Sequence, residues 1–147
     1  MMSKRGQMKL SFGMIFSIFL VIIFIAFAVY GIGKFLGFQK SVEIEKFVAD
    51  LRSDIEKVWK GSSSSVNVEY DVPPDVLRVC FENEEGIEEN MVIRYEKKID
   101  RFELDYLDIE KITGDENSFC IESENSKIKM HLQKDFGESK VTILRQS

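Results

Sequence analysis

The sequence has few of the residues that usually build catalytic or metal sites. Its 147 residues include one histidine, His131, and two cysteines, Cys80 and Cys120. It contains no glycine-rich phosphate loop and no nucleophile elbow. As a catalytic base His131 would need a nucleophile or an orienting carboxylate beside it, and no motif supplies either, so we expect it on the solvent face of a strand. The sequence therefore predicts a protein that is not an enzyme and uses no cofactor or metal.

Negative charge is absent from the N-terminal part of the chain. The first acidic residue is Glu43, whereas Lys4, Arg5, Lys9 and Lys34 all precede it. The first 36 residues carry a formal charge of +4 and the remaining 111 carry −9. An acidic domain is repelled by phosphate backbones and by anionic headgroups, so we do not expect nucleic acid as a partner.

The longest uncharged stretch runs from Leu10 to Gly33 and is apolar on every face. At about 1.5 Å per residue its 24 residues span roughly 36 Å, which is enough to cross a bilayer. A soluble helix of this character would need a much larger protein around it. We expect a transmembrane helix over residues 10–36, a basic cytoplasmic N-terminus over residues 1–9, and a C-terminal part outside the cytoplasm. The predicted localisation is the cell membrane, with a single pass.

Two processing routes compete with a plain anchor. Ala26-Phe27-Ala28 has the small-x-small form of a signal-peptidase site, and cleavage there would leave a chain that begins at Val29. The apolar stretch is longer than a usual signal core and continues past this site, which favours a retained anchor.

The second route is indicated by Lys4-Arg5-Gly6-Gln7, which stands directly before the hydrophobic segment. This start resembles the class III signal peptide of archaeal type IV pilin-like proteins. The resemblance implies cleavage between Gly6 and Gln7 on the cytoplasmic side, and a long N-terminal helix followed by a sheet. Members of that family commonly carry a serine and a glutamate where this chain has Lys9 and Ser11. That glutamate helps neighbouring subunits to register in a filament, so the resemblance bears more on the anchor than on filament assembly.

A second helical pattern covers residues 37–61. Ser41 is a plausible N-cap, and Gly61 after Lys57 and Lys60 is a typical C-terminal signal. Apolar residues recur at spacings of four and three: Ile44, Val48, Leu51, Ile55 and Val58. This stripe predicts an amphipathic stalk helix that packs on the β-sheet of its own chain. The transmembrane helix either continues into this helix, as one rod from Leu10 to Lys60, or is followed by it. The same spacing also fits two heptads of a coiled coil, which would make the protein a homo-oligomer.

Alternating apolar residues predict a β-rich domain over residues 62–147. The expected strands centre on residues 66–72, 77–81, 91–95, 119–121, 128–132 and 141–143. Residues 102–112 fit a strand or a helix, and we favour a strand that ends near Ile109. Polar connections at Asn125-Ser126 and at residues 134–139 predict that the last three strands form an antiparallel meander. The predicted fold class is α+β, with one mostly antiparallel sheet of about five to seven strands.

Cys80 and Cys120 each lie on the polar side of a predicted strand. Because exposed thiols outside the cytoplasm oxidise, we expect an intramolecular disulfide, which would contribute roughly 4 kcal/mol by closing its loop. The acidic run at residues 82–89 lacks the spacing of a calcium loop, so we expect a solvated hairpin loop there. The predicted function is that of a membrane-anchored structural or interaction protein, either a pilin-like subunit or an accessory subunit of a membrane complex that is neither cleaved nor polymerised.

Overall fold

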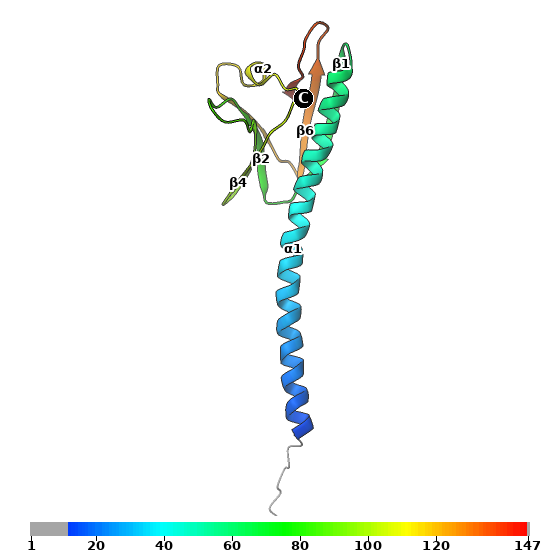
Figure 1. Cartoon of the computed structure of the whole chain (residues 1–147), viewed down its shortest axis with the longest axis vertical. Coiled ribbons are helices and arrows are strands. Elements are labelled where there is room, and N and C mark those ends of the chain that lie inside the picture. The colour runs from blue at the N-terminus through cyan, green and yellow to red at the C-terminus, as the bar shows by residue number, and fades with distance from the viewer. Residues whose placement is uncertain (1–11, 147) are drawn as a thin grey trace, which may run out of the picture. The chain divides into compact units, whose positions relative to one another are not determined.

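The structure is a computed structural model that describes residues 12–146. The chain divides into two compact units, Met1–Gln39 and Lys40–Ser147, called here the N-terminal and the C-terminal unit. Helix α1 runs from Phe12 to Lys60 and supplies all of the described part of the N-terminal unit (Figure 1). Every described residue of this unit is exposed.

Of the two predicted arrangements, the structure has the continuous helix and no separate helix that begins at Ser41. α1 continues without interruption through Gly31, Gly33, Gly37 and Ser41. A glycine inside a helix costs about 1 kcal/mol relative to alanine, which is far less than the roughly 3 kcal/mol of a proline, so glycine alone does not end a helix. The predicted end is confirmed, because α1 stops at Lys60 and the Gly61 amide donates to the Val58 carbonyl at 3.2 Å.

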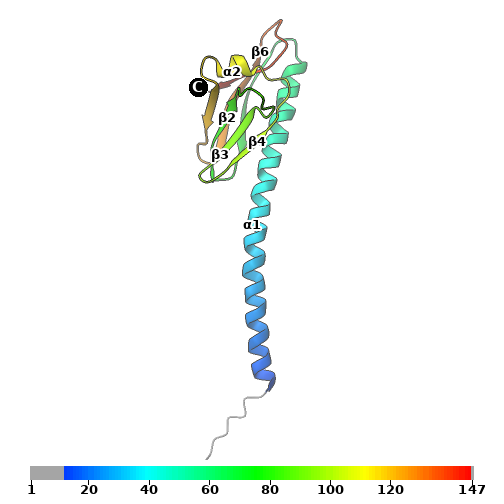
Figure 2. The ribbon, with the colours of Figure 1, turned by 60° about the vertical axis from the view of Figure 1, so that its left-hand side comes forward.

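After α1, the described part of the C-terminal unit contains seven strands and a short helix. Strands β1 (Ser64–Asp71), β6 (Lys127–Lys134) and β7 (Thr142–Arg145) form one antiparallel sheet in the order β1-β6-β7. Strands β4 (Ile99–Phe102), β3 (Met91–Tyr95), β2 (Val76–Glu82) and β5 (Ser118–Glu122) form a second one, in the order β4-β3-β2-β5. The α+β class is confirmed. A single sheet of five to seven strands was the wrong expectation, since each sheet is smaller (Figure 2).

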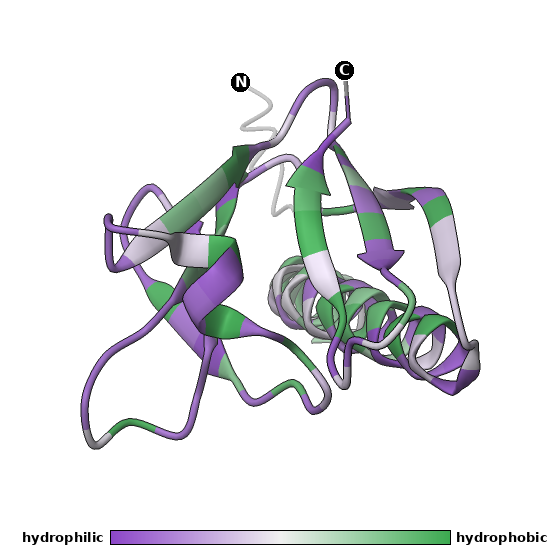
Figure 3. Cartoon of the chain, turned by 90° about the horizontal axis from the view of Figure 1, so that it is seen from above, coloured by the Kyte–Doolittle hydropathy of each residue, from purple (hydrophilic) through white to green (hydrophobic). Residues whose placement is uncertain are grey.

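The split between the sheets overturns the predicted meander. β6 and β7 do pair antiparallel, but β5 pairs with β2. The turn at Asn125-Ser126, where both residues have positive φ (53° and 60°), carries the chain from one sheet to the other. Figure 3 shows the strands of the two sheets as separate groups when the chain is seen from above.

The ambiguous segment at residues 102–112 is not a strand to Ile109. β4 ends at Phe102, and helix α2 covers Ile109–Thr113. Asp108 caps this helix, because its side chain accepts a hydrogen bond from the Lys111 amide at 3.2 Å. The cap and the helical face at Ile109 and Ile112 therefore decide the local structure.

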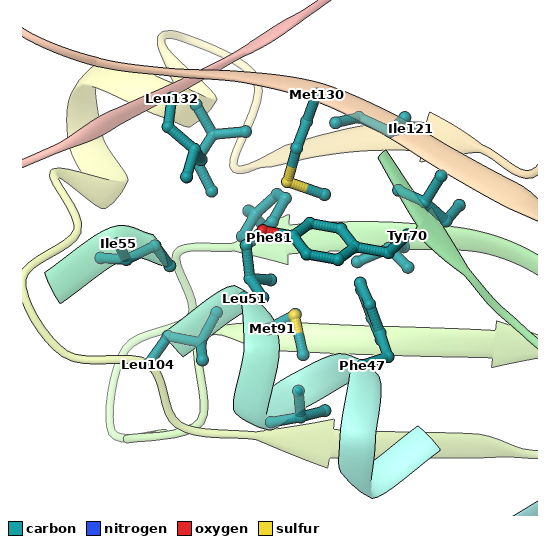
Figure 4. Packing of buried hydrophobic residues seen from close by; sticks show 14 of the residues in the cluster. Phe47, Leu51, Ile55, Tyr70, Phe81, Met91, Leu104, Ile121, Met130 and Leu132 are labelled. Carbon is teal, nitrogen blue, oxygen red and sulfur yellow. The ribbon is translucent and has the colours of Figure 1, made fainter. Parts of the chain in front are cut away.

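One apolar cluster lies between the elements of the C-terminal unit. It contains residues of α1, both sheets and the segment around Leu104, and Figure 4 shows Leu51, Phe81 and Met130 within it. Leu51, Phe81 and Met130 are fully buried. Leu77, predicted to face this core, is instead 52% exposed, because the register of β2 shifts between Val76 and Arg78.

Candidate functional site

The N-terminal unit presents a long apolar surface that its own chain does not cover. Helix α1 is long and apolar enough to cross a membrane, and no residue of its most apolar window is buried. The aromatic residues alone show the extent of this exposure: Phe24 is 70% exposed, Phe27 75% and Phe38 68%. An apolar surface of this size is unfavourable in water and is typical of a site that binds lipid or another protein. It is therefore the first candidate interaction site.

The predicted stripe on α1 lies in the core of the C-terminal unit. Its five residues are at most 6% exposed, and they share one cluster with residues of both sheets: Ile44, Val48, Leu51, Ile55 and Val58. Phe47 belongs to the same face, and its ring meets that of Tyr70 on β1 edge-on, with centroids 5.3 Å apart.

A hydrogen bond accompanies this aromatic contact. The Tyr70 hydroxyl donates to Asp54 Oδ2 at 2.8 Å, and Lys57 Nζ lies 2.7 Å from the other oxygen of the same carboxylate. Burial, and then the hydrogen bond to Asp54, raise the pKa of Tyr70 above its ordinary value. A neutral tyrosine is therefore part of the contact between α1 and β1.

The two cysteines face each other across neighbouring strands. Cys80 on β2 and Cys120 on β5 are register partners, and their sulfur atoms lie at disulfide-bonding distance, 2.03 Å. The expectation that both lie on a polar face is wrong for Cys80, which is 0% exposed. Its chain neighbours Val79 and Phe81, which point to the opposite face of the sheet, are also 0% exposed, so β2 is covered on both faces at its centre.

Cys80 alternates with Arg78 and Glu82, and these charged neighbours led to the prediction that Cys80 is exposed. Glu82 on β2 accepts a hydrogen bond from Arg94 on β3 at 2.5 Å and lies 3.5 Å from Arg101 on β4. These side chains neutralise one another across three strands. The charged residues on this face of the sheet therefore pair with one another.

A groove of about 460 Å³ adjoins Cys120 where the two sheets approach each other. Its lining includes Cys120 and Ile121 of β5 and charged residues of β2, β5, the turn after β5, β6 and β7: Arg78, Glu122, Glu124, Lys127, Lys129 and Arg145. Arg145 donates to the Cys120 carbonyl at 3.1 Å and lies over the Phe119 ring, 5.5 Å from its centroid. Lys127 and Lys129 also pair with Glu69 on β1.

The other residues considered in the sequence analysis are His131, the acidic run at residues 82–89 and the Gly6-Gln7 pair. His131 Nδ1 lies 2.6 Å from the Asn67 side-chain oxygen across the β1-β6 pair, on the face opposite the core. The acidic run 82–89 begins at the end of β2 and continues into the loop before β3, where Glu84 lies 3.5 Å from Arg101. Among residues 12–146 no group of three or more His, Cys, Asp or Glu side chains is placed to hold a metal ion. Gly6 and Gln7 lie outside the described residues.

Sequence reasoning missed an aromatic group at the Lys60 end of α1. The rings of Trp59 and Tyr106 stack with centroids 4.0 Å apart, and Trp59 Nε1 donates to the Ser139 carbonyl at 3.1 Å. Tyr106 has φ of 65°, which is uncommon for a residue with a side chain. In the nearby β6-β7 turn Phe136 is 86% exposed. Only this last residue had a readable signal, a phenylalanine inside a polar turn.

Comparisons with protein-family models, with curated proteins and with solved structures found no match for this chain.

Proposed function

We propose that this chain is a membrane-anchored structural or interaction protein whose C-terminal unit lies outside the cytoplasm. The observation that carries the proposal is the complete exposure of an apolar helix in the N-terminal unit. Hydrocarbon can cover such a helix on all sides, and the helix satisfies its own backbone hydrogen bonds there. The basic residues Lys4, Arg5 and Lys9 precede it, which favours a cytoplasmic N-terminus.

The same proposal assigns the buried stripe of α1 to packing within the chain. Its residues are at most 6% exposed, and α1 and β1 are joined by the Phe47–Tyr70 ring contact and the Tyr70–Asp54 hydrogen bond. A coiled coil would need this face free for a second copy. We therefore infer that α1 packs on the sheets of its own chain and that the stripe is not an oligomerisation surface.

A pilin-like subunit is the specific form of the proposal that Lys4-Arg5-Gly6-Gln7 supports. Such a subunit would lose residues 1–6 and keep the apolar helix, which could then exchange lipid for neighbouring copies. The alternative is an accessory subunit of a membrane complex that is neither cleaved nor polymerised. Ser11 favours this alternative, because it stands where the resembling family carries the glutamate that helps neighbouring subunits to register in a filament.

Mass spectrometry of the intact protein from the membrane and soluble fractions of the native cell, and from the medium, tests these forms. A chain that begins at Gln7 supports the pilin-like form, and one that begins at Met1 or Met2 supports the accessory subunit. A soluble chain that begins at Val29 contradicts the anchor altogether. Gly6→Val should block cleavage before Gln7, whereas the matched variant Gly13→Val should leave it unchanged.

Accessibility of the C-terminal unit supplies the second measurement. An epitope tag after the last residue should bind antibody on intact cells, and a tag before Met1 should bind only after permeabilisation. The reverse pattern would contradict the proposed orientation even if the protein remained in the membrane.

A further inference from the structure

The two sulfur atoms of the cysteine pair differ in their surroundings. Cys80 lies on the central strand β2 and is 0% exposed, while Cys120 lies on β5 at the edge of the sheet and is partly exposed. Cys120, and not Cys80, lines the groove of about 460 Å³ between the sheets. A molecule in solution can therefore approach the pair through the groove, and it meets Cys120 first.

The charges around Cys120 suit an anionic attacker. The Arg145 guanidinium donates to the Cys120 carbonyl at 3.1 Å, and among residues 12–146 Arg145 takes part in no ion pair. Arg78 lines the same groove and likewise has no ion-pair partner within that range. Glu122 and Glu124 reduce the positive charge of the groove, but its lining also holds four cations: Arg78, Lys127, Lys129 and Arg145. An excess of positive charge in the lining attracts an anionic thiolate into the groove.

We propose that Cys120 is a site of S-thiolation, at which a small anionic thiol enters the groove between the sheets. In this step the incoming thiolate forms a bond to Cys120 Sγ, and the Cys80–Cys120 bond breaks. The electron pair of that bond leaves with Cys80 Sγ, which takes up a proton from solvent, and the incoming group remains on Cys120 as a mixed disulfide. The inference concerns the cysteine pair alone and does not depend on the proposed assembly role.

The first test maps the adduct on the full-length oxidised protein in detergent. Brief treatment with glutathione, quenching with N-ethylmaleimide and peptide mass spectrometry should place glutathione on Cys120 and maleimide on Cys80. The opposite distribution, or an equal one, would overturn the proposal. So would adducts that form only at denaturant concentrations that unfold the protein, because the groove would then give no access.

The second test compares thiols of similar size and different charge. After correction for the thiolate fraction, 2-mercaptoethanesulfonate should react about tenfold faster than 2-mercaptoethylamine at low ionic strength, and the ratio should approach one in about 1 M salt. Arg145→Gln should slow the sulfonate but leave neutral 2-mercaptoethanol unchanged. The matched control is Lys46→Gln, on the exposed surface of α1 and away from the groove. Equal rates for the two charged thiols, or equal slowing of all thiols in Arg145→Gln, would contradict the electrostatic part.

Discussion

Between Phe12 and Gln39 every residue of α1 is exposed, whereas between Ile44 and Val58 the same helix places six side chains in a core at 6% exposure or less. Both stretches are helical and both are rich in apolar residues. The difference lies in their pattern, because the first is apolar all round and the second has one apolar stripe with charged residues opposite. An apolar stripe can be covered by the chain itself, while an apolar cylinder needs an apolar solvent or many neighbours.

This contrast shows that a helical backbone does not determine whether the side chains of the helix are buried. α1 passes from one environment to the other without a cap or a break at Ser41. The backbone therefore gives no sign of the boundary, and only side-chain exposure marks it. Substitutions with the same chemistry should have opposite effects in the two regions.

The largest effect is expected for Leu51→Asp. Leu51 is 0% exposed, so Asp at this position would place an unpaired carboxylate in the core. We expect the free energy of unfolding to fall by about 4 kcal/mol or more, which is enough to unfold a domain of this size. The only tryptophan, Trp59, lies on the same helix, and its fluorescence in urea titrations reports this unfolding.

Ala49→Asp is the matched control, since it adds the same charge two residues away on the exposed side of α1. It should change the free energy of unfolding by about 0.5 kcal/mol or less. If Leu51→Asp stayed folded and only dissociated an oligomer, the stripe would be a coiled-coil surface and the comparison of the two regions would fail.

The next effect in size concerns the cysteine pair. Replacing Cys80 and Cys120 together by alanine should lower the free energy of unfolding by about 4 kcal/mol, since the bond closes a loop with a sequence separation of 40. Reductant should destabilise the unsubstituted protein by a similar amount and leave the double variant unaffected. Phe24→Ala, which removes a larger side chain from the N-terminal unit, should not move the urea midpoint. A double variant as stable as the original would show that the bond is not formed in the folded protein.

The elements that could be predicted from the sequence are those whose signal is local. Alternation in residues 66–72 predicts β1, and the spacing of Ile44, Val48 and Leu51 predicts the buried face of α1. The register of β2 could not be predicted, because the bulge after Val76 exposes Leu77 and breaks the alternation. The burial of Cys80 was hidden for a different reason, since its neighbours across the sheet, Val92 and Cys120, come from other strands and cannot be read from β2 alone.

Long-range pairing was the other part that the sequence did not contain. The short connection at Asn125-Ser126 looks like a hairpin turn, yet it joins two sheets, because β5 finds its partner in β2. The groove at Cys120 results from that choice and has no local signature. The candidate anchor, in contrast, depends only on composition over a contiguous stretch, and it could be identified without any pairing.

The smallest effect expected is at the contact between Tyr70 and Asp54. Tyr70→Phe removes a hydrogen bond of 2.8 Å and should lower the free energy of unfolding by about 1 kcal/mol at neutral pH. This is a small value for a hydrogen bond to a charged group, because the pair is partly exposed. The pH dependence is more informative than this loss. Burial and then the Asp54 hydrogen bond raise the pKa of Tyr70 in the folded state, while in the unfolded state it stays near 10.

The folded protein therefore holds the Tyr70 proton more tightly than the unfolded protein does. Its stabilising contribution is fully present below about pH 10 and is lost as the pH rises above that value, by up to about 1.4 kcal/mol per pH unit. Urea titrations from pH 8 to 11 should show a steeper decline for the original protein than for Tyr70→Phe. Tyr95, whose pKa is also raised by burial, gives the control Tyr95→Phe, which should remove a separate share of the decline. If the free energy of unfolding fell equally with pH in Tyr70→Phe and in the original protein, the phenol would not be buried against α1. The buried part of the helix would then lack the contact between Tyr70 and Asp54.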